Sequence, residues 1–550
     1  MTLNRGSPKN SMIILKAEPV LSPTHTLRPV CLRTLGWLLL LFLATQLIFL
    51  GRPTVNTEHA FVEAALSLAN MQPQERIDYF WYYQANPLGY PLNAAMLLQL
   101  LPMLKPLAVV RLLSVLGGML LLISMADLLR YLPETKKTAD RWSLILLAVH
   151  PMVWIYSNNA TADILPAGLI LGALACCCRG RTNMFWHLLG ILLFSSACIV
   201  KFNSALIGGA FVFILLTWAS YDRERWLIHT GWLIAYAVCS IATLLAYFVW
   251  IYHQFNIIIL PERYKEIFTS SLSIEHAALT LLFYLGFLMI FAGPLVLVMF
   301  STLLKKRDET WFNRRLLALI CFYCLVVVSI DGMNTPGEMN FGRLAKLLPP
   351  LALTLVYASG ISMVLLFFHL CARSLSNPRQ QGFLGLILSA SIPFLLISSA
   401  TRPAQRYLIL ILPLLLAWFV HLAWQLRPVV SRILMIATFI VFIGLSTLGS
   451  LYLNSKALAA ERMAHWVRDH DLIEETNPRI LANHIGSYFP LQKPAKPQYR
   501  MEIWPRKQDL STLTPEHIEP LSIGPFLIKR YVLVPIVQKE PQKEEPEISN

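Results

Sequence analysis

A few ionisable side chains stand at the ends of long apolar segments, where packing alone gives no reason for them. Two are the carboxylates Glu58 and Asp163, and three are the cations Lys201, Arg406 and Arg111. Charged groups close to a membrane are costly and commonly functional. A carboxylate here could act as a general base toward an incoming hydroxyl or amine. The cations could hold a phosphate, to which the planar fork of arginine donors is well suited.

Each of these groups also has an ordinary structural explanation. Glu58 could be a solvated loop acid or the acidic first residue of a helix, with Glu63 five residues later. Asp163 could cap the apolar helix that follows it. Lys201 could extend toward lipid headgroups, and the arginines could make unspecific headgroup contacts. The residue types alone leave both interpretations open.

A metal site depends on the fold. Glu58, Glu63 and Asp163 could bind a divalent cation only if the fold brings the three carboxylates together. His253, His276 and His421 show no pairing at the spacing of metal ligands. We therefore predict no cofactor and leave a divalent cation open.

The elements that must position these side chains are transmembrane helices. The chain has 550 residues, of which 56% are hydrophobic and 14% are charged, whereas about a quarter of the residues of a soluble domain are charged. Apolar stretches of about 17–25 residues recur, and this length crosses a hydrocarbon core of about 30 Å. We predict a mainly α, polytopic bundle of about 13 spans in an integral membrane protein. The third of these spans is predicted at residues 143–156.

The charge pattern predicts the topology. The net charge of +15 is explained by basic cytoplasmic loops, and we expect no nucleic-acid partner. Every strongly basic loop falls on one side when residues 91–104 are an interfacial helix that does not cross the membrane. The first outer loop is then 51–104. A later outer loop carries Glu262 and Arg263, which could lie over the site as a lid or form a plain surface helix.

The predicted domains follow from this topology. Residues 1–34 form a cytoplasmic leader, and 35–453 form the transmembrane domain. Residues 454–537 form a small α/β extracytoplasmic domain, with a helix at 456–470 and strands at 479–483 and 526–537. The Lys-, Glu- and Pro-rich tail 538–550 is expected to be disordered.

Short motifs recur in a characteristic order at the predicted outer face. They are Thr57-Glu58-His59-Ala60-Phe61, Asn86-Pro87-Leu88-Gly89-Tyr90-Pro91, Val110-Arg111-Leu112-Leu113-Ser114, Thr161-Ala162-Asp163, Val200-Lys201-Phe202, and Arg406-Tyr407 followed by Leu412-Pro413. In this order the chain resembles the GT-C superfamily of membrane glycosyltransferases. The closest similarity is to the branch that holds the protein O-mannosyltransferases and the bacterial aminoarabinose transferase that modifies lipid A.

The resemblance implies an activity. A sugar carried on a polyprenyl phosphate would be moved, with inversion, to a lipid, glycan or protein acceptor at the outer face of the membrane. Membrane lipids are further partners. The absence of disulfides and of a retention signal favours a bacterial inner membrane, and we expect the site and the C-terminal domain to lie in the periplasm. An endoplasmic reticulum membrane is the alternative.

The resemblance also implies roles for single residues. Glu58 would lie near the acceptor and Asp163 would position the acceptor or substrate. Lys201, Arg406, Tyr407 and Arg111 would hold the donor phosphate and stabilise its charge as it leaves. Tyr90, Glu262 and Arg263 would belong to segments beside the substrate.

One position departs from the pattern of the branch. Thr57 stands where the branch carries its first Asp, and threonine cannot act as a base. Either Glu58 or Glu63 takes that role, or the chemistry differs, or the chain is inactive. A flippase or transporter of a lipid-linked saccharide and a non-catalytic relative are therefore kept as alternatives. We found no internal repeat, and the unusual charges gather on one face, which favours an enzyme over a transporter.

Overall fold

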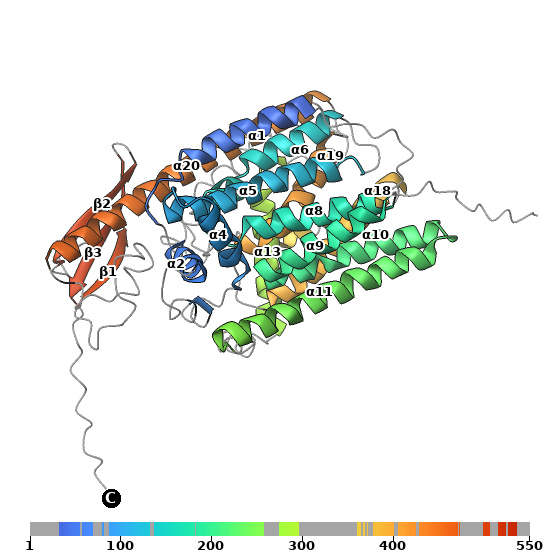
Figure 1. The fold of residues 1–550 in the computed structure, drawn as a ribbon. Helices are drawn as coiled ribbons and strands as arrows, with labels where there is room; N and C mark the ends of the chain where they lie inside the picture. The colour runs from blue at the N-terminus through green and yellow to red at the C-terminus, as the bar shows by residue number, and fades with distance from the viewer. Residues whose placement is uncertain are drawn as a thin grey trace, which may run out of the picture.

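A computed structural model gives the fold of the chain (Figure 1). The structure describes residues 32–54, 58–69, 77, 80–81, 87–131, 137–181, 183–257, 274–295, 360–364, 367–368, 371, 378–400, 405–424, 428–470, 472, 499–505, 515–523 and 526–535. Most of them are helical, as predicted. The predictions for residues 1–31, Thr57, the loop with Glu262 and Arg263, the strand at 479–483 and the tail 538–550 lie outside these residues.

The helices follow one another along most of the described chain. They are α1 (Leu32–Leu47), α2 (Glu58–Leu68), α4 (Gly89–Leu100), α5 (Pro106–Leu128), α6 (Lys137–Val149), α7 (Pro151–Ser157), α8 (Ile164–Gly180), α9 (Met184–Val200), α10 (Gly208–Tyr221), α11 (Trp226–Phe255), α13 (Ile274–Phe291), α18 (Pro378–Ser399), α19 (Leu412–Trp424) and α20 (Pro428–Asp469), with the 3-10 helices η1 (Phe202–Ile207) and η2 (Gln405–Leu410).

Several of these helices suit a membrane. Among the described residues, five are long and apolar enough to cross one: α5, η1 with α10, α11, most of α18, and α20. Their outward side chains are apolar and exposed, as at Ile241 and Leu245 of α11, which is the surface that lipid would cover. The chain is an integral membrane protein. The count of about 13 spans stays a prediction.

Helix α8 packs against both α5 and α9. Glycines allow the close approach, because a methyl group added at Gly168 would lie 2.6 Å from the carbonyl oxygen of Gly117. α8 and α9 are consecutive helices joined by a short turn, so they run in opposite directions. The first residue before α8, Asp163, and the first residue after α9, Lys201, therefore lie at the same end of the bundle.

The predicted third span at 143–156 is two helices, α6 and α7. His150 separates them in an extended conformation (φ −62°, ψ 130°), and its ring accepts a hydrogen bond from the backbone N–H of Met152 at 3.2 Å. The cause is Pro151, which disfavours a helical conformation in the residue before it. α7 is short and leads directly into the turn at Asn158–Asp163.

Helices α2 and α4 lie at the end of the bundle that carries this turn (Figure 1). α4 has 12 residues, which is too short to cross a bilayer and agrees with a helix that does not cross. Its Met96, Leu100 and the nearby Met103 are exposed. On its other side, the hydroxyl of Tyr90 donates to the carbonyl of Val110 at 2.7 Å and anchors α4 to α5.

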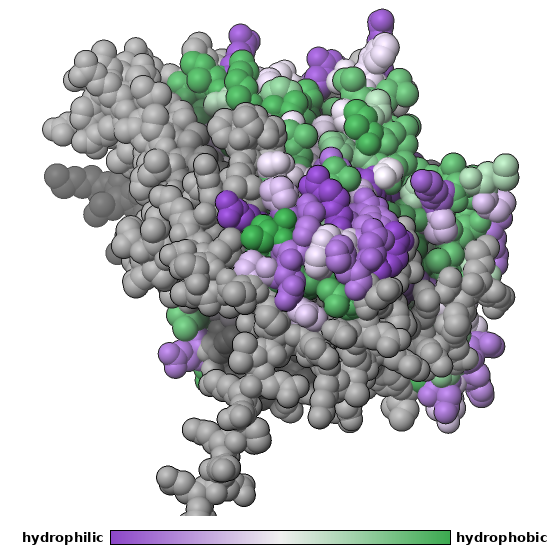
Figure 2. Space-filling view, turned by 90° about the vertical axis from the view of Figure 1, so that its left-hand side faces the viewer, coloured by the Kyte–Doolittle hydropathy of each residue, from purple (hydrophilic) through white to green (hydrophobic). Residues whose placement is uncertain are grey.

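Helix α20 extends from the bundle to a small sheet. It runs for 42 residues and continues without a break through residues 453 and 454. The strands β1 (Tyr499–Pro505), β2 (His517–Ile523) and β3 (Phe526–Pro535) are antiparallel in the order β1-β3-β2. Leu521 and Leu533 share a core with Met463 and Val467 of α20. Figure 2 views this end and shows hydrophilic residues gathered in the middle of the face, with hydrophobic residues above them.

Candidate functional site

The turn between α7 and α8, Asn158–Asp163, lies between two buried clusters of charge. The first cluster joins Asp163 to cations from α9 and η2. The second joins Glu58 to two arginines and is held against the backbone of the same turn. Each cluster contains two cations and one carboxylate among the residues that the structure describes.

The first cluster gathers residues from three separate parts of the sequence. Lys201 Nζ forms an ion pair with Asp163 Oδ1, and Arg406 Nε lies 4.0 Å from the same oxygen. Both cations also lie over the ring of Tyr407, with Lys201 Nζ 4.7 Å and Arg406 Cζ 5.7 Å from its centroid. This places Asp163, Lys201, Arg406 and Tyr407 together, four of the residues predicted to form the site.

The charges of this cluster stabilise one another. Burial raises the pKa of Asp163, but Lys201 and Arg406 outweigh this effect and hold it below its ordinary value. Burial lowers the pKa of Arg406, but Asp163 outweighs this and raises it. Arg406 is the most open member, with 35% of its side chain exposed against 5% for Asp163. Its Nε is buried on the side of Asp163 and has no hydrogen-bond partner among the residues that the structure describes. The exposed part of the Arg406 side chain can meet a ligand while the carboxylate lies behind it.

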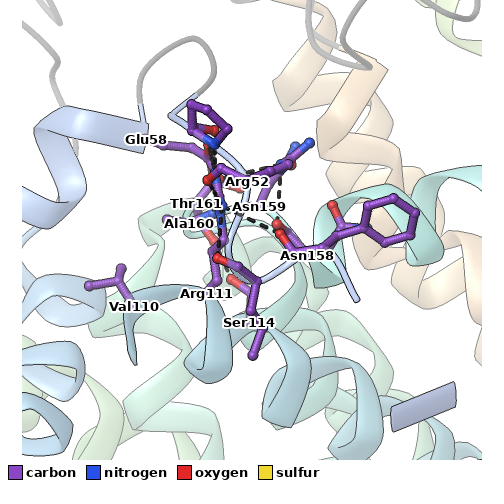
Figure 3. A network of polar contacts seen from close by, with 12 residues as sticks. Arg52, Glu58, Val110, Arg111, Ser114, Asn158, Asn159, Ala160 and Thr161 are labelled. Atoms are coloured by element: carbon purple, nitrogen blue, oxygen red, sulfur yellow. Dashed lines mark hydrogen bonds and ion pairs between the residues drawn. The ribbon is translucent and has the colours of Figure 1, made fainter. Parts of the chain in front are cut away.

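The second cluster is centred on Glu58, at the start of α2 (Figure 3). Arg111 of α5 binds its carboxylate with two donors, Nε to Oε1 at 3.0 Å and Nη2 to Oε2 at 2.6 Å. The backbone N–H of Ala160 donates to Oε1 at 2.7 Å. Arg52 Nη2 lies 3.5 Å from the same oxygen. Glu58 therefore ties α2, α5 and the Asn158–Asp163 turn together.

Arg111 also binds the backbone of the segment that connects α1 and α2. Its Nη1 donates to the carbonyls of Leu50 at 3.0 Å and of Arg52, and its Nη2 donates to the carbonyl of Pro53 at 2.8 Å. All three guanidinium nitrogens are used, and the side chain is fully buried. Arg111 was predicted to bind the donor phosphate with Lys201 and Arg406. It is instead occupied by Glu58 and by backbone carbonyls in the other cluster.

The environment of Glu58 does not suit a general base. Burial raises its pKa, but the neighbouring charges of Arg111 and Arg52 outweigh burial and lower the pKa to about 2. A carboxylate that is this acidic and this fully bonded has little tendency to take a proton. The contacts of Glu58 favour a structural role, and its predicted place beside the acceptor stays a prediction.

Two further predicted residues, Tyr90 and Glu63, are buried. Besides its bond to Val110, Tyr90 has its hydroxyl 2.7 Å from Ser114 Oγ and its ring edge-to-face with Phe61. Glu63 is 5% exposed in α2. Within the part of the chain that the structure describes, no three His, Cys, Asp or Glu side chains form a group that could hold a metal ion. The three carboxylates Glu58, Glu63 and Asp163 thus do not form a metal site there.

Arg52 and the asparagines of the turn were missed by the sequence reasoning. Arg52 Nη2 donates to the carbonyl of Asn158 at 3.2 Å and also to Asn159 Oδ1. A signal was present, because Arg52 is a cation that directly follows the first predicted span on its predicted outer side, but the sequence reasoning did not consider it. A hollow between α10 and α18, lined by Gly209, Phe213 and Ser389 among others, contains none of the predicted site residues.

Comparison with known proteins adds a likeness of fold. No protein-family model and no curated protein matches the sequence. Among solved structures the chain is similar to ArnT from Cupriavidus metallidurans, with a TM-score of 0.36 and 13% identity for the apo state. For the structure bound to undecaprenyl phosphate the TM-score is 0.40 and the identity 14%. Both alignments cover 90% of this chain and 98% of the ArnT chain. At these values the function has to be argued from this chain's own residues.

Proposed function

We propose that the chain is a membrane glycosyltransferase of the GT-C superfamily that moves a sugar from a polyprenyl-phosphate donor to an acceptor. The observation that carries this proposal is the cluster of Asp163, Lys201, Arg406 and Tyr407 at one end of an apolar bundle. A lipid with an anionic headgroup suits such a site, because its tail can lie along the helices while its phosphate meets the cations.

The leaving group explains why two cations are needed. When the bond between the sugar and the phosphate breaks, negative charge develops on the lipid phosphate. Donors that are already held in place stabilise that charge without first reorganising. In this proposal Lys201 and Arg406 supply these donors. Asp163 orients both cations from behind, and the ring of Tyr407 supports them on a second side.

The cluster at Glu58 has a supporting role in this proposal. It fixes the turn from which Asp163 projects, through the bond from the N–H of Ala160 to Glu58. Positioning of this kind matters because small displacements of catalytic groups cost large factors in rate. Glu58 is then a positioning residue, and the proton acceptor of the reaction is left unassigned.

The proposed sidedness follows the charge pattern of the loops. The short loop between α10 and α11 carries Arg223 and Arg225 and lies at the opposite end of the bundle from the sheet (Figure 1). The positive-inside rule places such a loop in the cytoplasm. The site and the sheet then face the outside, which would be the periplasm if the membrane is a bacterial inner membrane.

A transfer assay tests the proposal. Purified protein in nanodiscs is incubated with radiolabelled polyprenyl-phosphate monosaccharides and a membrane extract, and both sugar transfer and release of polyprenyl phosphate are followed. We expect one donor to be consumed, with turnover reduced at least a hundredfold in Lys201→Met and in Arg406→Gln. Saturable binding without transfer from any donor would contradict the enzyme and favour a flippase or a non-catalytic relative.

A further inference from the structure

A stack of three aromatic rings joins the far end of α20 to the sheet. The ring centroid of Trp466 lies 4.0 Å from that of His470, one turn further along α20, with 22° between the two planes. The ring centroid of His517, on β2, lies 4.4 Å from that of Trp466, with 6° between the planes. Two imidazole rings that are this close to one indole and nearly parallel to it would overlap on the same face. They therefore lie on opposite faces of Trp466.

The stack lies where the sheet packs on α20 (Figure 1). Leu521 of β2 and Leu533 of β3 share a buried core with Met463 and Val467 of α20. The sheet has three strands, and so small a sheet depends on a hydrophobic face or a packed helix for its stability. Contacts between α20 and β2 therefore help to keep the sheet both folded and attached.

The contacts of both histidines favour the protonated imidazole. A cation over the face of an indole is attracted more strongly than a neutral ring. His517 Nε2 also lies 2.9 Å from Glu519 Oε1, a contact that becomes an ion pair when the ring is protonated. His470 Nδ1 lies 2.8 Å from the carbonyl oxygen of Trp466. That carbonyl belongs to the last turn of α20, where the helix dipole favours positive charge.

The charged groups around the stack also favour a proton on balance. The described titratable side chains of residues 461–470 and 515–519 outside the stack, together with the tyrosine of β1 that packs on the same core, are Glu461, Arg462, His465, Arg468, Asp469, Glu516, Glu519 and Tyr499. Arg462, which is exposed, lies 3.4 Å from Glu519, and Arg468 lies 3.4 Å from Asp469. Two arginines therefore stand against four carboxylates, and each arginine already has a carboxylate partner.

We propose that the stack of His470, Trp466 and His517 is a pH-sensitive contact that holds the sheet more tightly against α20 as the pH falls. Histidine side chains commonly change their charge between about pH 5 and 8. Because the protonated rings bind the indole more strongly, attachment of the sheet takes up protons, and its stability must rise as the pH falls through this range. The proposal goes beyond glycosyl transfer and needs neither a donor nor the cluster of Lys201 and Arg406.

Amide hydrogen exchange of the full chain in nanodiscs tests the proposal. Peptides that cover β2 are followed at about pH 5.5 and about pH 8, on either side of the histidine range, and the rates are corrected for the intrinsic effect of pH. Detachment of the sheet exposes its amides, so their protection reports how stably it is attached. We expect protection that is about tenfold higher at the lower pH, the combined effect of two cation–π contacts.

Substitutions of the histidines make the result decisive. The double variant His470→Gln/His517→Gln keeps two planar polar side chains that do not titrate, and its protection should be equal at both pH values. If it does not fold, the two single variants decide, because each should lose part of the pH dependence. His253→Gln, at an exposed histidine near the end of α11, is the matched control and should keep the full dependence.

Two results would overturn the proposal. One is equal protection of β2 at both pH values in the unsubstituted chain. The other is an unchanged pH dependence in the histidine variants, which would assign it to another group such as His465. The measurement uses no polyprenyl phosphate, so this proposal and the glycosyltransferase can fail independently.

Discussion

At the scale of single residues, the molecule separates charged groups that look alike in the sequence. Glu58 and Asp163 are both buried carboxylates that meet two cations. Asp163 stands behind partly open cations, whereas Glu58 is enclosed by Arg111 and the backbone of Ala160. The sequence predicted that Asp163 would lie near Lys201 and Arg406, because their motifs follow a characteristic order and all fall on the predicted outer side. It could not predict that Arg111 would pair with Glu58, because the pairing depends on how α2 packs on α5.

The pH dependence of stability reports on Glu58. Its folded-state pKa of about 2 lies below the ordinary 4.5, so its contribution is present above pH 4.5 and is lost as the pH falls from there toward 2. We expect the thermal midpoint of the unsubstituted chain to fall through this range, and part of that fall to be missing in Glu58→Gln. At pH 7 the same variant should lose about 3 kcal/mol of stability, because two arginines remain buried without their carboxylate.

The control for this variant is Asp469→Asn, at a pair with Arg468 in which both side chains are exposed. Exposed ion pairs contribute little to stability, so this change should leave the midpoint within about a degree. If Glu58→Gln unfolds at the same temperature as the control, Glu58 does not hold the turn and its assigned role is wrong.

At the scale of elements, the site depends on how closely α5 and α8 approach. Apolar length predicted both helices, and the order of the spans predicted that Asp163 and Lys201 would share a face. The break at His150 was not predicted, because the apolar pattern of residues 143–156 continues across it. Pro151 indicates a break in the helix at His150. The length needed to cross a membrane nevertheless favoured one continuous helix over residues 143–156.

Gly168→Ala tests the contact between α5 and α8. The added methyl group would lie 2.6 Å from the carbonyl oxygen of Gly117, so α8 must shift and carry Asp163 with it. We expect a loss of about 1–3 kcal/mol in stability and weaker binding of polyprenyl phosphate. Gly231→Ala in α11, where nothing lies within 4 Å of the added group, should change neither. Native binding by Gly168→Ala would show that the cluster tolerates movement of α8.

At the scale of the whole molecule, the sheet and the basic loop between α10 and α11 lie at opposite ends of the bundle (Figure 1). Composition predicted a membrane protein and a change of character near residue 454. It did not predict that α20 would run through that point as one helix of 42 residues. Nor did it predict that β1 and β2 both pair with β3. Strand pairing joins residues that are far apart in the sequence, and the local pattern of one strand does not specify its partner.

Cysteine labelling tests the proposed orientation. A cysteine at Asp469, an exposed residue at the end of α20, should react with a membrane-impermeant maleimide in intact cells. A cysteine at Glu224, exposed in the loop between α10 and α11, should react only after the membrane is made permeable. The unsubstituted chain gives the background from its own cysteines. The reverse pattern would place the sheet and the site in the cytoplasm.

The most direct test of the central claim is the affinity of the chain for a polyprenyl phosphate, for which undecaprenyl phosphate serves as the probe. Binding is measured in nanodiscs for the unsubstituted chain, for Lys201→Met, for Arg406→Gln and for the control Arg462→Gln. The account predicts saturable binding that is weakened about tenfold or more by each of the first two changes and unaffected by the third. Equal affinity in all four proteins would show that the cluster of Asp163, Lys201, Arg406 and Tyr407 does not bind a lipid phosphate.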